Sequence, residues 1–242
     1  MKIRKRFWFL VFFFCVASDK SFAEESEGVD SFDYPIDNFQ PGSYAGRVFG
    51  CCSTRRHLGQ DIKAEPLTPV RAVGDGEIVG KGISGAHCSY GMVVIIEHTL
   101  LDGSAITSIY GHMSNRAGYK PTLSGAVKKG DVIGYVGHSG GKPPKTSCVD
   151  DDENGDGGQH LHFGIRKEVA PKDKNGNPIW KYFGYAGYGE DVDIDAQGTS
   201  HGGKFTDGKK FIDAYNKRYE DIDQDNDGFL ASQGDCNDQD AS

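Results

Sequence analysis

The chain has 242 residues, 37% of them hydrophobic, which is enough for one sizeable core with additional segments. Its formal net charge is −8 at pH 7, and the acidic residues are concentrated at 150–156 and 219–242. Without a basic stripe, the composition argues against a nucleic-acid-binding protein.

Residues 1–23 predict a secretory signal peptide. A basic start, MKIRKR, precedes an apolar stretch and a Ser-Phe-Ala end, with cleavage expected after Ala23. The stretch is shorter than the roughly 20 residues that a transmembrane helix needs, although an uncleaved anchor is an alternative. We therefore expect an exported protein, periplasmic or extracellular, without a stable membrane span once the leader is removed.

The next segment, residues 24–43, is acidic, rich in serine and interrupted by proline. It shows neither the helical nor the strand hydrophobic period, so it is predicted to be an extended lead-in.

Five cysteines follow the leader: Cys51, Cys52, Cys88, Cys148 and Cys236. An exported protein with this many cysteines is expected to form disulfides, and an odd count leaves one thiol over. Bridges from Cys51 or Cys52 to Cys88 or Cys148 would tie loops together, but the sequence does not fix the pairing. The alternative, a structural zinc cluster of Cys51, Cys52 and His57, lacks the second cysteine pair that such clusters use.

From residue 44 to 204 the pattern is that of a β protein. Short apolar runs are separated by glycine, aspartate and serine turns at intervals typical of antiparallel sheets. The runs are PVRAV, GEIVGKG, MVVIIEH, AITSIYGHM, VIGYVG and LHFGI. The expected fold class is therefore all-β.

Three segments carry residues suited to a metal site. His57 and Asp61 are four residues apart in HLGQD, and His160 and His162 alternate with apolar residues in QHLHF, so on a strand both imidazoles point to one face. Two histidines and one carboxylate, with a fourth position left for water, are typical of catalytic zinc. His112 in IYGHMS adds a further imidazole, but residue chemistry alone does not separate His160 from His162.

A single histidine is more often a surface or core residue than a ligand, and only the joint pattern favours a site. The four histidines without such company, His87, His98, His138 and His201, are interpreted as structural or solvent-exposed.

In this order, HLGQDI, PVRAVGDGEIVGKG, YGMVVIIEH, IYGHMS, VKKGDVIGYVGHSGG and QHLHFGI resemble the lysostaphin-type, or LytM-type, zinc metalloendopeptidases. These enzymes cut peptide cross-links of bacterial peptidoglycan. The resemblance runs from about Tyr44 to Arg166 and implies an antiparallel β-sheet domain of the duplicated hybrid motif type. It implies zinc ligands at His57, Asp61 and His162, and it implies a catalytic pair, His112 and His160.

The resemblance also implies peptide stems or bridges of peptidoglycan as the substrate, without choosing the bond, and a small hydrolase of proteins is a near neighbour. Some relatives have lost the site residues and serve as silent wall-binding or amidase-activating modules. All five positions are kept here, which favours an active enzyme.

One departure from the family pattern is an acidic, proline-started insert, KPPKTSCVDDDENGDG, within residues 142–158. It directly precedes the strand expected to carry His160 and His162. We expect the insert to border the substrate, and the sequence leaves open whether it inhibits the enzyme.

Residues 168–204 contain an aromatic cluster beside a turn at Asn175-Gly176, and these aromatics are expected to cover the sheet or to line a binding surface. Residues 205–220 then predict a short helix, because Phe211, Ile212 and Tyr215 have helical spacing.

The tail, residues 221–242, places Asp223, Asp225 and Asp227 at alternate positions before Gly228, like the first half of an EF-hand loop. The twelfth position is Gly234 instead of glutamate, so the tail looks more like the aspartate-rich calcium repeats of secreted proteins. It predicts calcium binding, with a solvated acidic tail as the alternative. A calcium-dependent adhesion protein is a rival for the whole chain, although only one such motif is present.

Overall fold

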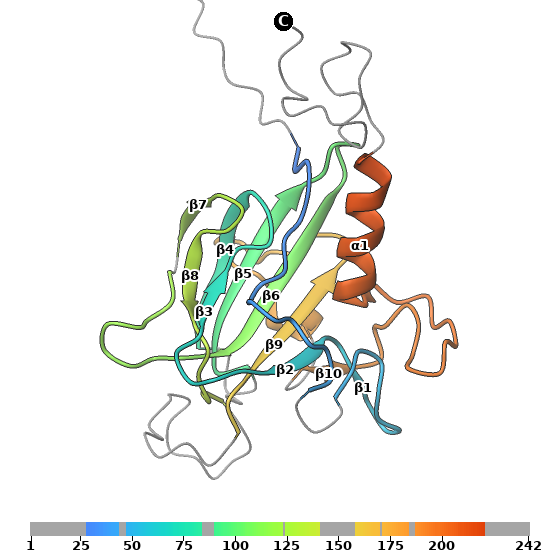
Figure 1. Ribbon diagram of the computed structural model, residues 1–242. Helices are drawn as coiled ribbons and strands as arrows, with labels where there is room; N and C mark the ends of the chain where they lie inside the picture. The colour runs from blue at the N-terminus through green and yellow to red at the C-terminus, as the bar shows by residue number, and fades with distance from the viewer. Residues whose placement is uncertain are drawn as a thin grey trace, which may run out of the picture.

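The computed structural model describes residues 28–43, 47–83, 90–122, 124–140, 158–169, 171–183 and 187–220. Within these ranges the chain forms eleven short strands, one α-helix and one 3-10 turn (Figure 1). All strand pairs are antiparallel. The expected all-β class is confirmed.

The centre of the molecule is a seven-stranded sheet in the order β11-β9-β6-β5-β4-β7, with β2 also paired to β9. Its strands are β2 (Gln60–Lys63), β4 (Gly76–Ile83), β5 (Met92–Thr99), β6 (Ala105–Met113), β7 (Gly125–Val127), β9 (His160–Arg166) and β11 (Phe205–Thr206). Two small ribbons complete the fold: β1 (Arg56–His57) with β10 (Tyr188–Gly189), and β3 (Pro69–Arg71) with β8 (Val132–Tyr135). Each of the six predicted apolar runs contributes to one of these strands.

The central strand β5 is buried on both of its faces. Val94 and Ile96 pack into one hydrophobic cluster, and Val93 and Ile95 pack into the other. Side chains alternate between the two faces of a strand, so a strand that is covered on both faces has a continuous run of apolar residues, as β5 has. Helix α1 (Gly208–Tyr219) covers the first face, and Phe183 of the 3-10 turn η1 (Trp180–Phe183) packs on the second.

The helix is the element predicted at residues 205–220. Asp207 caps it, because its side chain accepts a hydrogen bond from the backbone N–H of Lys210. Ile212, Tyr215 and Tyr219 share one helical face and are buried in the first cluster.

Residues 28–43, predicted as a lead-in, are built into the core. Val29, Phe32, Ile36 and Phe39 are buried in the first cluster, and Figure 1 shows this segment crossing the sheet beside α1. Asn216 of α1 binds both backbone groups of one residue in it, accepting from the Phe32 N–H and donating to the Phe32 carbonyl, each at 2.8 Å.

The turn at Asn175-Gly176 is present, with Gly176 at φ 82° and Asp173 accepting hydrogen bonds from Asn175 and Asn177. Among the nearby aromatics, Phe183 is buried against the sheet and Tyr182 is exposed.

Several predictions fall outside the described residues: the leader, the calcium tail with Asp223, Asp225 and Asp227, most of the acidic insert, His87, and Cys88, Cys148 and Cys236. Cys51 and Cys52 lie within them and carry free thiols, with their sulfur atoms 2.8 Å apart. The disulfides to Cys88 or Cys148 therefore stay predictions. In the part of the chain that the structure describes, every helix is too short or too polar to cross a membrane.

Candidate metal centre and neighbouring histidines

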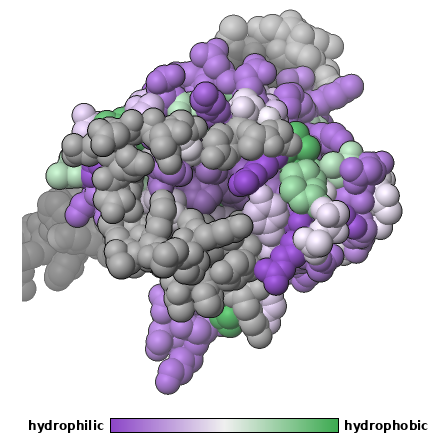
Figure 2. Space-filling model, turned by 90° about the horizontal axis from the view of Figure 1, so that it is seen from below, coloured by the Kyte–Doolittle hydropathy of each residue, from purple (hydrophilic) through white to green (hydrophobic). Residues whose placement is uncertain are grey.

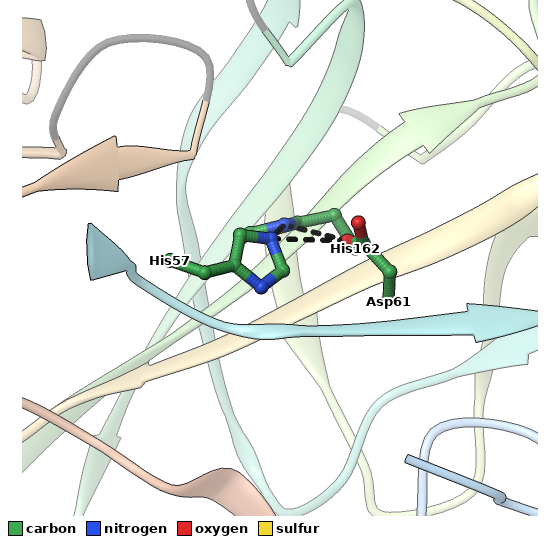
Figure 3. A group of neighbouring side chains, drawn as sticks. All are labelled: His57, Asp61 and His162. Atoms are coloured by element: carbon green, nitrogen blue, oxygen red, sulfur yellow. Dashed lines mark hydrogen bonds and ion pairs between the residues drawn. The ribbon is translucent and has the colours of Figure 1, made fainter. Parts of the chain in front are cut away.

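Three strands bring His57, Asp61 and His162 to one point (Figure 3). His57 ends β1, whereas Asp61 on β2 lies directly opposite His162 on β9 in the antiparallel register. His57 Nε2 and His162 Nδ1 are 3.2 Å and 3.1 Å from Asp61 Oδ1, and the two nitrogens are 3.0 Å apart. All three residues are buried.

These distances match the donor set of a four-coordinate zinc ion. Ligands about 2.0–2.1 Å from zinc in a tetrahedron lie about 3.3 Å from one another. The ring orientation of His57 also fits, because its Nδ1 faces the Val48 carbonyl at 3.3 Å, which leaves the Nε2 lone pair toward Asp61. Three electron-pair donors packed this closely repel one another unless a cation lies between them, so the residues fit the expected metal.

Asp61 is the negative charge at the centre of this group. Without a metal ion, ring protons of the two histidines take the place of the cation. Burial would raise the pKa of the Asp61 carboxyl group, but hydrogen bonds from His162 and His57 then outweigh burial and hold this pKa well below its usual range. Asp61 is therefore ionised at any pH at which the protein is expected to work.

His160 and His112 form a second pair beside the first group, with ring centroids 4.5 Å apart. His160 Nε2 is 3.8 Å from Asp61 Oδ2. His160 Nδ1 donates to the Gly158 carbonyl and His112 Nδ1 donates to the Ser139 carbonyl, at 2.7 Å and 2.8 Å. These bonds make Nε2 of each ring the acceptor atom.

The backbone at His112 is unusual, because its φ of 59° lies in the left-handed region that side chains other than glycine rarely adopt. The pairing of β5 with β6 shifts register between Met92 and Val94, so His112 lies in an irregular part of the ladder. Ser139 holds this part in place: its hydroxyl accepts from the Met92 N–H and donates to the Met113 carbonyl. The sequence motif GHSGG gave no indication of this role for Ser139.

Two glycines allow the chain to pass close to the His162 ring. A Cβ on Gly59 would lie 2.6 Å from His162 Nε2, and one on Gly187 would lie 2.8 Å from its Cε1. The glycine within H-x-G-x-D therefore leaves room for the imidazole that faces Asp61.

Sequence reasoning missed residues that surround the site. Arg47 Nη1 is 3.9 Å from Asp61 Oδ2, the Tyr188 ring lies 4.9 Å from that of His57, and the Tyr90 ring lies 5.1 Å from that of His162. Arg47 lies outside every quoted motif, and Tyr188 belongs to the aromatic residues of 168–204, for which lining a binding surface is one of two expectations. Only the tertiary structure places both of them here.

The remaining described histidines divide as follows. His98 is fully buried, donating from Nδ1 to the Asp75 carbonyl and facing the Ser108 hydroxyl with Nε2, both at 2.7 Å. His201 is exposed and pairs with Asp195 at 3.1 Å. His138 lies near the site, since it is close enough to His112 and His160 to add a minor contribution to pKa values that burial lowers. No cysteine belongs to the metal-capable group found among the described residues, so the zinc cluster with Cys51 and Cys52 finds no support there.

Comparison with known proteins gives the same assignment. Residues 55–179, slightly more than half of the chain, match the family model of peptidase family M23. The chain belongs to peptidase family M23. The matched range contains the three predicted zinc ligands and the two predicted catalytic histidines, and the resemblance inferred from the motifs is confirmed.

Among curated proteins, the chain is similar to the DD-carboxypeptidase/endopeptidase Mpg of Neisseria meningitidis serogroup B and to that of Neisseria gonorrhoeae. Each is 33% identical over 117 residues, which cover 48% of this chain and 21% of the relative. The chain thus aligns with about a fifth of the length of these relatives.

Solved structures of similar proteins include the catalytic domain of lysostaphin from Staphylococcus simulans, at 23% identity and a TM-score of 0.32, covering 60% of this chain and 80% of that one. A lytM protein described as a glycyl-glycine endopeptidase, from Ruminococcus gnavus, is 26% identical with a TM-score of 0.31, covering 46% and 39%. At these TM-scores the superpositions add nothing to the family assignment.

Proposed function

We propose that this M23 chain is a zinc-dependent endopeptidase that hydrolyses peptide cross-links of bacterial peptidoglycan. The observation that carries the proposal is the approach of His57 Nε2, Asp61 Oδ1 and His162 Nδ1 to within 3.0–3.2 Å of one another. A second pair of imidazoles lies directly beside them. A structural metal site is normally closed by a fourth protein ligand, and the metal-capable group found in the described residues offers only three.

A zinc ion held by His57, Asp61 and His162 would supply Lewis acidity to a scissile carbonyl and to water. The protein's own contribution is to fix these three groups on different strands before the substrate arrives, so that little reorganisation is needed during the reaction.

The proposed catalytic pair, His112 and His160, handles protons. Burial lowers the pKa of His112 to about 4 and that of His160 to about 3, so both rings are neutral at pH 7. With each Nδ1 donating to a carbonyl, each Nε2 can accept a proton from the attacking water or donate a hydrogen bond once protonated.

The substrate class is supported by the six ordered motifs and by the endopeptidase named in the Mpg relatives. A peptidoglycan substrate also agrees with export of the protein, which the predicted leader would direct. The calcium-binding tail and the acidic insert beside the substrate remain parts of this proposal.

The decisive experiment is mass analysis of the muropeptides released from isolated sacculi by the zinc-loaded protein. We expect shortened cross-linked species that identify the bond cut, and we expect a chelator to abolish their release and added zinc to restore it. The same muropeptide masses with and without the zinc-loaded protein would refute the proposal.

A silent wall-binding or amidase-activating module is the alternative within the same fold. It would bind sacculi without releasing fragments, even when the protein carries one zinc ion per chain. Zinc content measured on the sample used for digestion separates this alternative from an enzyme that is merely lacking metal.

A further inference from the structure

Arg47 is held beside the metal centre by both its backbone and its side chain. Its carbonyl accepts a hydrogen bond from the Asp61 N–H at 3.0 Å, and its Nη1 lies 3.9 Å from Asp61 Oδ2. Nevertheless, 44% of its side chain is exposed, whereas that of Asp61 is almost fully buried. The guanidinium therefore lies between the buried carboxylate and solvent.

Arg47 differs from Arg56, the first residue of β1, in its acidic partner. Arg56 Nη1 is 3.7 Å from Asp195 Oδ2, so Arg56 is paired away from the metal ligands. Figure 2 shows the molecule from below, and the coloured residues in this view are mostly hydrophilic.

A guanidinium at this position is suited to a carboxylate ligand. It presents several N–H groups in a planar fork that matches the two oxygens of a carboxylate. A cation shared by His57, Asp61 and His162 would take up the charge of Asp61, so the positive charge of Arg47 would then act on the substrate.

We propose that Arg47 is a specificity-determining residue that binds a free carboxylate on the substrate residue supplying the leaving amine. The inference rests on the peptidase function proposed above. When one carbon of this residue carries both the amine and the carboxylate, the carboxyl carbon is about 2.5 Å from the scissile nitrogen. A carboxylate this close to the scissile bond lies within reach of a guanidinium adjacent to a metal ligand.

The first test needs no variant. Two cross-linked muropeptides are compared that differ at one group, a free carboxylate or a carboxamide on the residue supplying the leaving amine. We expect the wild-type, zinc-loaded protein to cleave the carboxylate form with a kcat/KM about 10- to 100-fold higher, the range for one charge-assisted hydrogen bond.

The second test removes the guanidinium group of Arg47. Arg47→Gln should lose most of this preference, because kcat/KM should fall much more on the carboxylate form than on the carboxamide form, and Arg47→Lys should restore part of it because the charge is kept. Lys217→Gln removes the same charge from an exposed position on α1, on the other side of the sheet, and should retain the full preference.

The outcomes separate the possible roles of Arg47. Equal losses on both muropeptides, together with weaker zinc binding, would show that Arg47 only positions Asp61, which overturns the proposal. Equal cleavage of the two muropeptides by the wild type overturns it as well, but leaves the peptidase function intact. Cleavage of neither muropeptide and no release from sacculi overturns both proposals.

Discussion

Two imidazoles of identical chemistry, two residues apart on β9, occupy different surroundings. His162 Nδ1 is 3.1 Å from Asp61 Oδ1 and close to His57 Nε2, whereas His160 Nε2 is 3.8 Å from the other carboxylate oxygen and its ring lies against that of His112. One histidine thus belongs to the metal-capable group, and the other lies beside it.

This difference predicts opposite results for two alanine variants. His162→Ala removes one of three donor atoms and should abolish stoichiometric zinc binding and hydrolysis. His112→Ala leaves the three donors in place and should keep one zinc ion per chain while lowering kcat by about 10²- to 10⁴-fold, as expected for loss of a proton-transfer group.

Zinc content by atomic absorption and kcat on a defined muropeptide measure the two effects on the same preparations. Circular dichroism controls for folding. A His112→Ala protein that loses zinc, or a His162→Ala protein that keeps both zinc and full activity, would contradict the assigned roles.

His98 predicts how stability depends on pH. Burial lowers its pKa to about 4, while the unfolded chain should titrate near the ordinary value of about 6.5. Between these values the unfolded state binds the proton more tightly, so stability present above pH 6.5 is lost as the pH falls toward 4, by up to about 3 kcal/mol from this group.

Urea unfolding of the metal-free protein at pH 7.5 and pH 4.5 measures this loss. His98→Gln cannot titrate and should show a smaller difference between the two pH values than wild type does. His201→Gln, at an exposed position, is the control, and an unchanged difference in His98→Gln would show that His98 is not responsible.

At the scale of elements, helix α1 and the segment at residues 28–43 stabilise one another against the sheet. The Phe32 ring packs edge-on against those of His98 and Tyr215, and the Tyr215 hydroxyl donates to the Val29 carbonyl. Asn216 closes the contact with its two hydrogen bonds to the Phe32 backbone. The two ends of the described chain are thereby joined over the first hydrophobic cluster.

Asn216→Ala should lower the free energy of unfolding by about 2–3 kcal/mol, because it removes two hydrogen bonds and leaves backbone groups of Phe32 without their partners. Urea unfolding at pH 7.5 measures the change. The adjacent Lys217→Gln variant should stay within about 0.5 kcal/mol of wild type. Equal stability of Asn216→Ala and wild type would mean that this segment is not fixed by the helix.

At the scale of the whole molecule, the proposed zinc ion would connect β1, β2 and β9. A ligand that binds the folded protein alone stabilises it by about 2.7 kcal/mol when present at 100 times its Kd. For a chain of this size, that corresponds to an increase in Tm of roughly 5–10 °C.

Thermal unfolding with zinc and with a chelator tests this coupling. Wild type and His112→Ala should show the same increase in Tm on adding zinc, and His162→Ala should show almost none. An equal increase in all three proteins would place the stabilising zinc elsewhere in the chain.

The sequence by itself determined the fold class and the family. Alternating and continuous apolar runs bounded by glycine predict antiparallel strands, because the two-residue period of a strand is a local property. The ordered motifs around His57, His112 and His162 are also local, and the match over residues 55–179 confirms the family that they indicated.

Only the tertiary structure decided which atoms meet. The antiparallel register sets Asp61 opposite His162, the His112 ring lies against that of His160 at a residue with left-handed backbone, and Arg47 comes close to Asp61 although no motif contains it. The different distances of His160 and His162 from Asp61 are also known only from the tertiary structure. Contacts between strands depend on register and on the packing of distant segments, which no local period of the sequence contains.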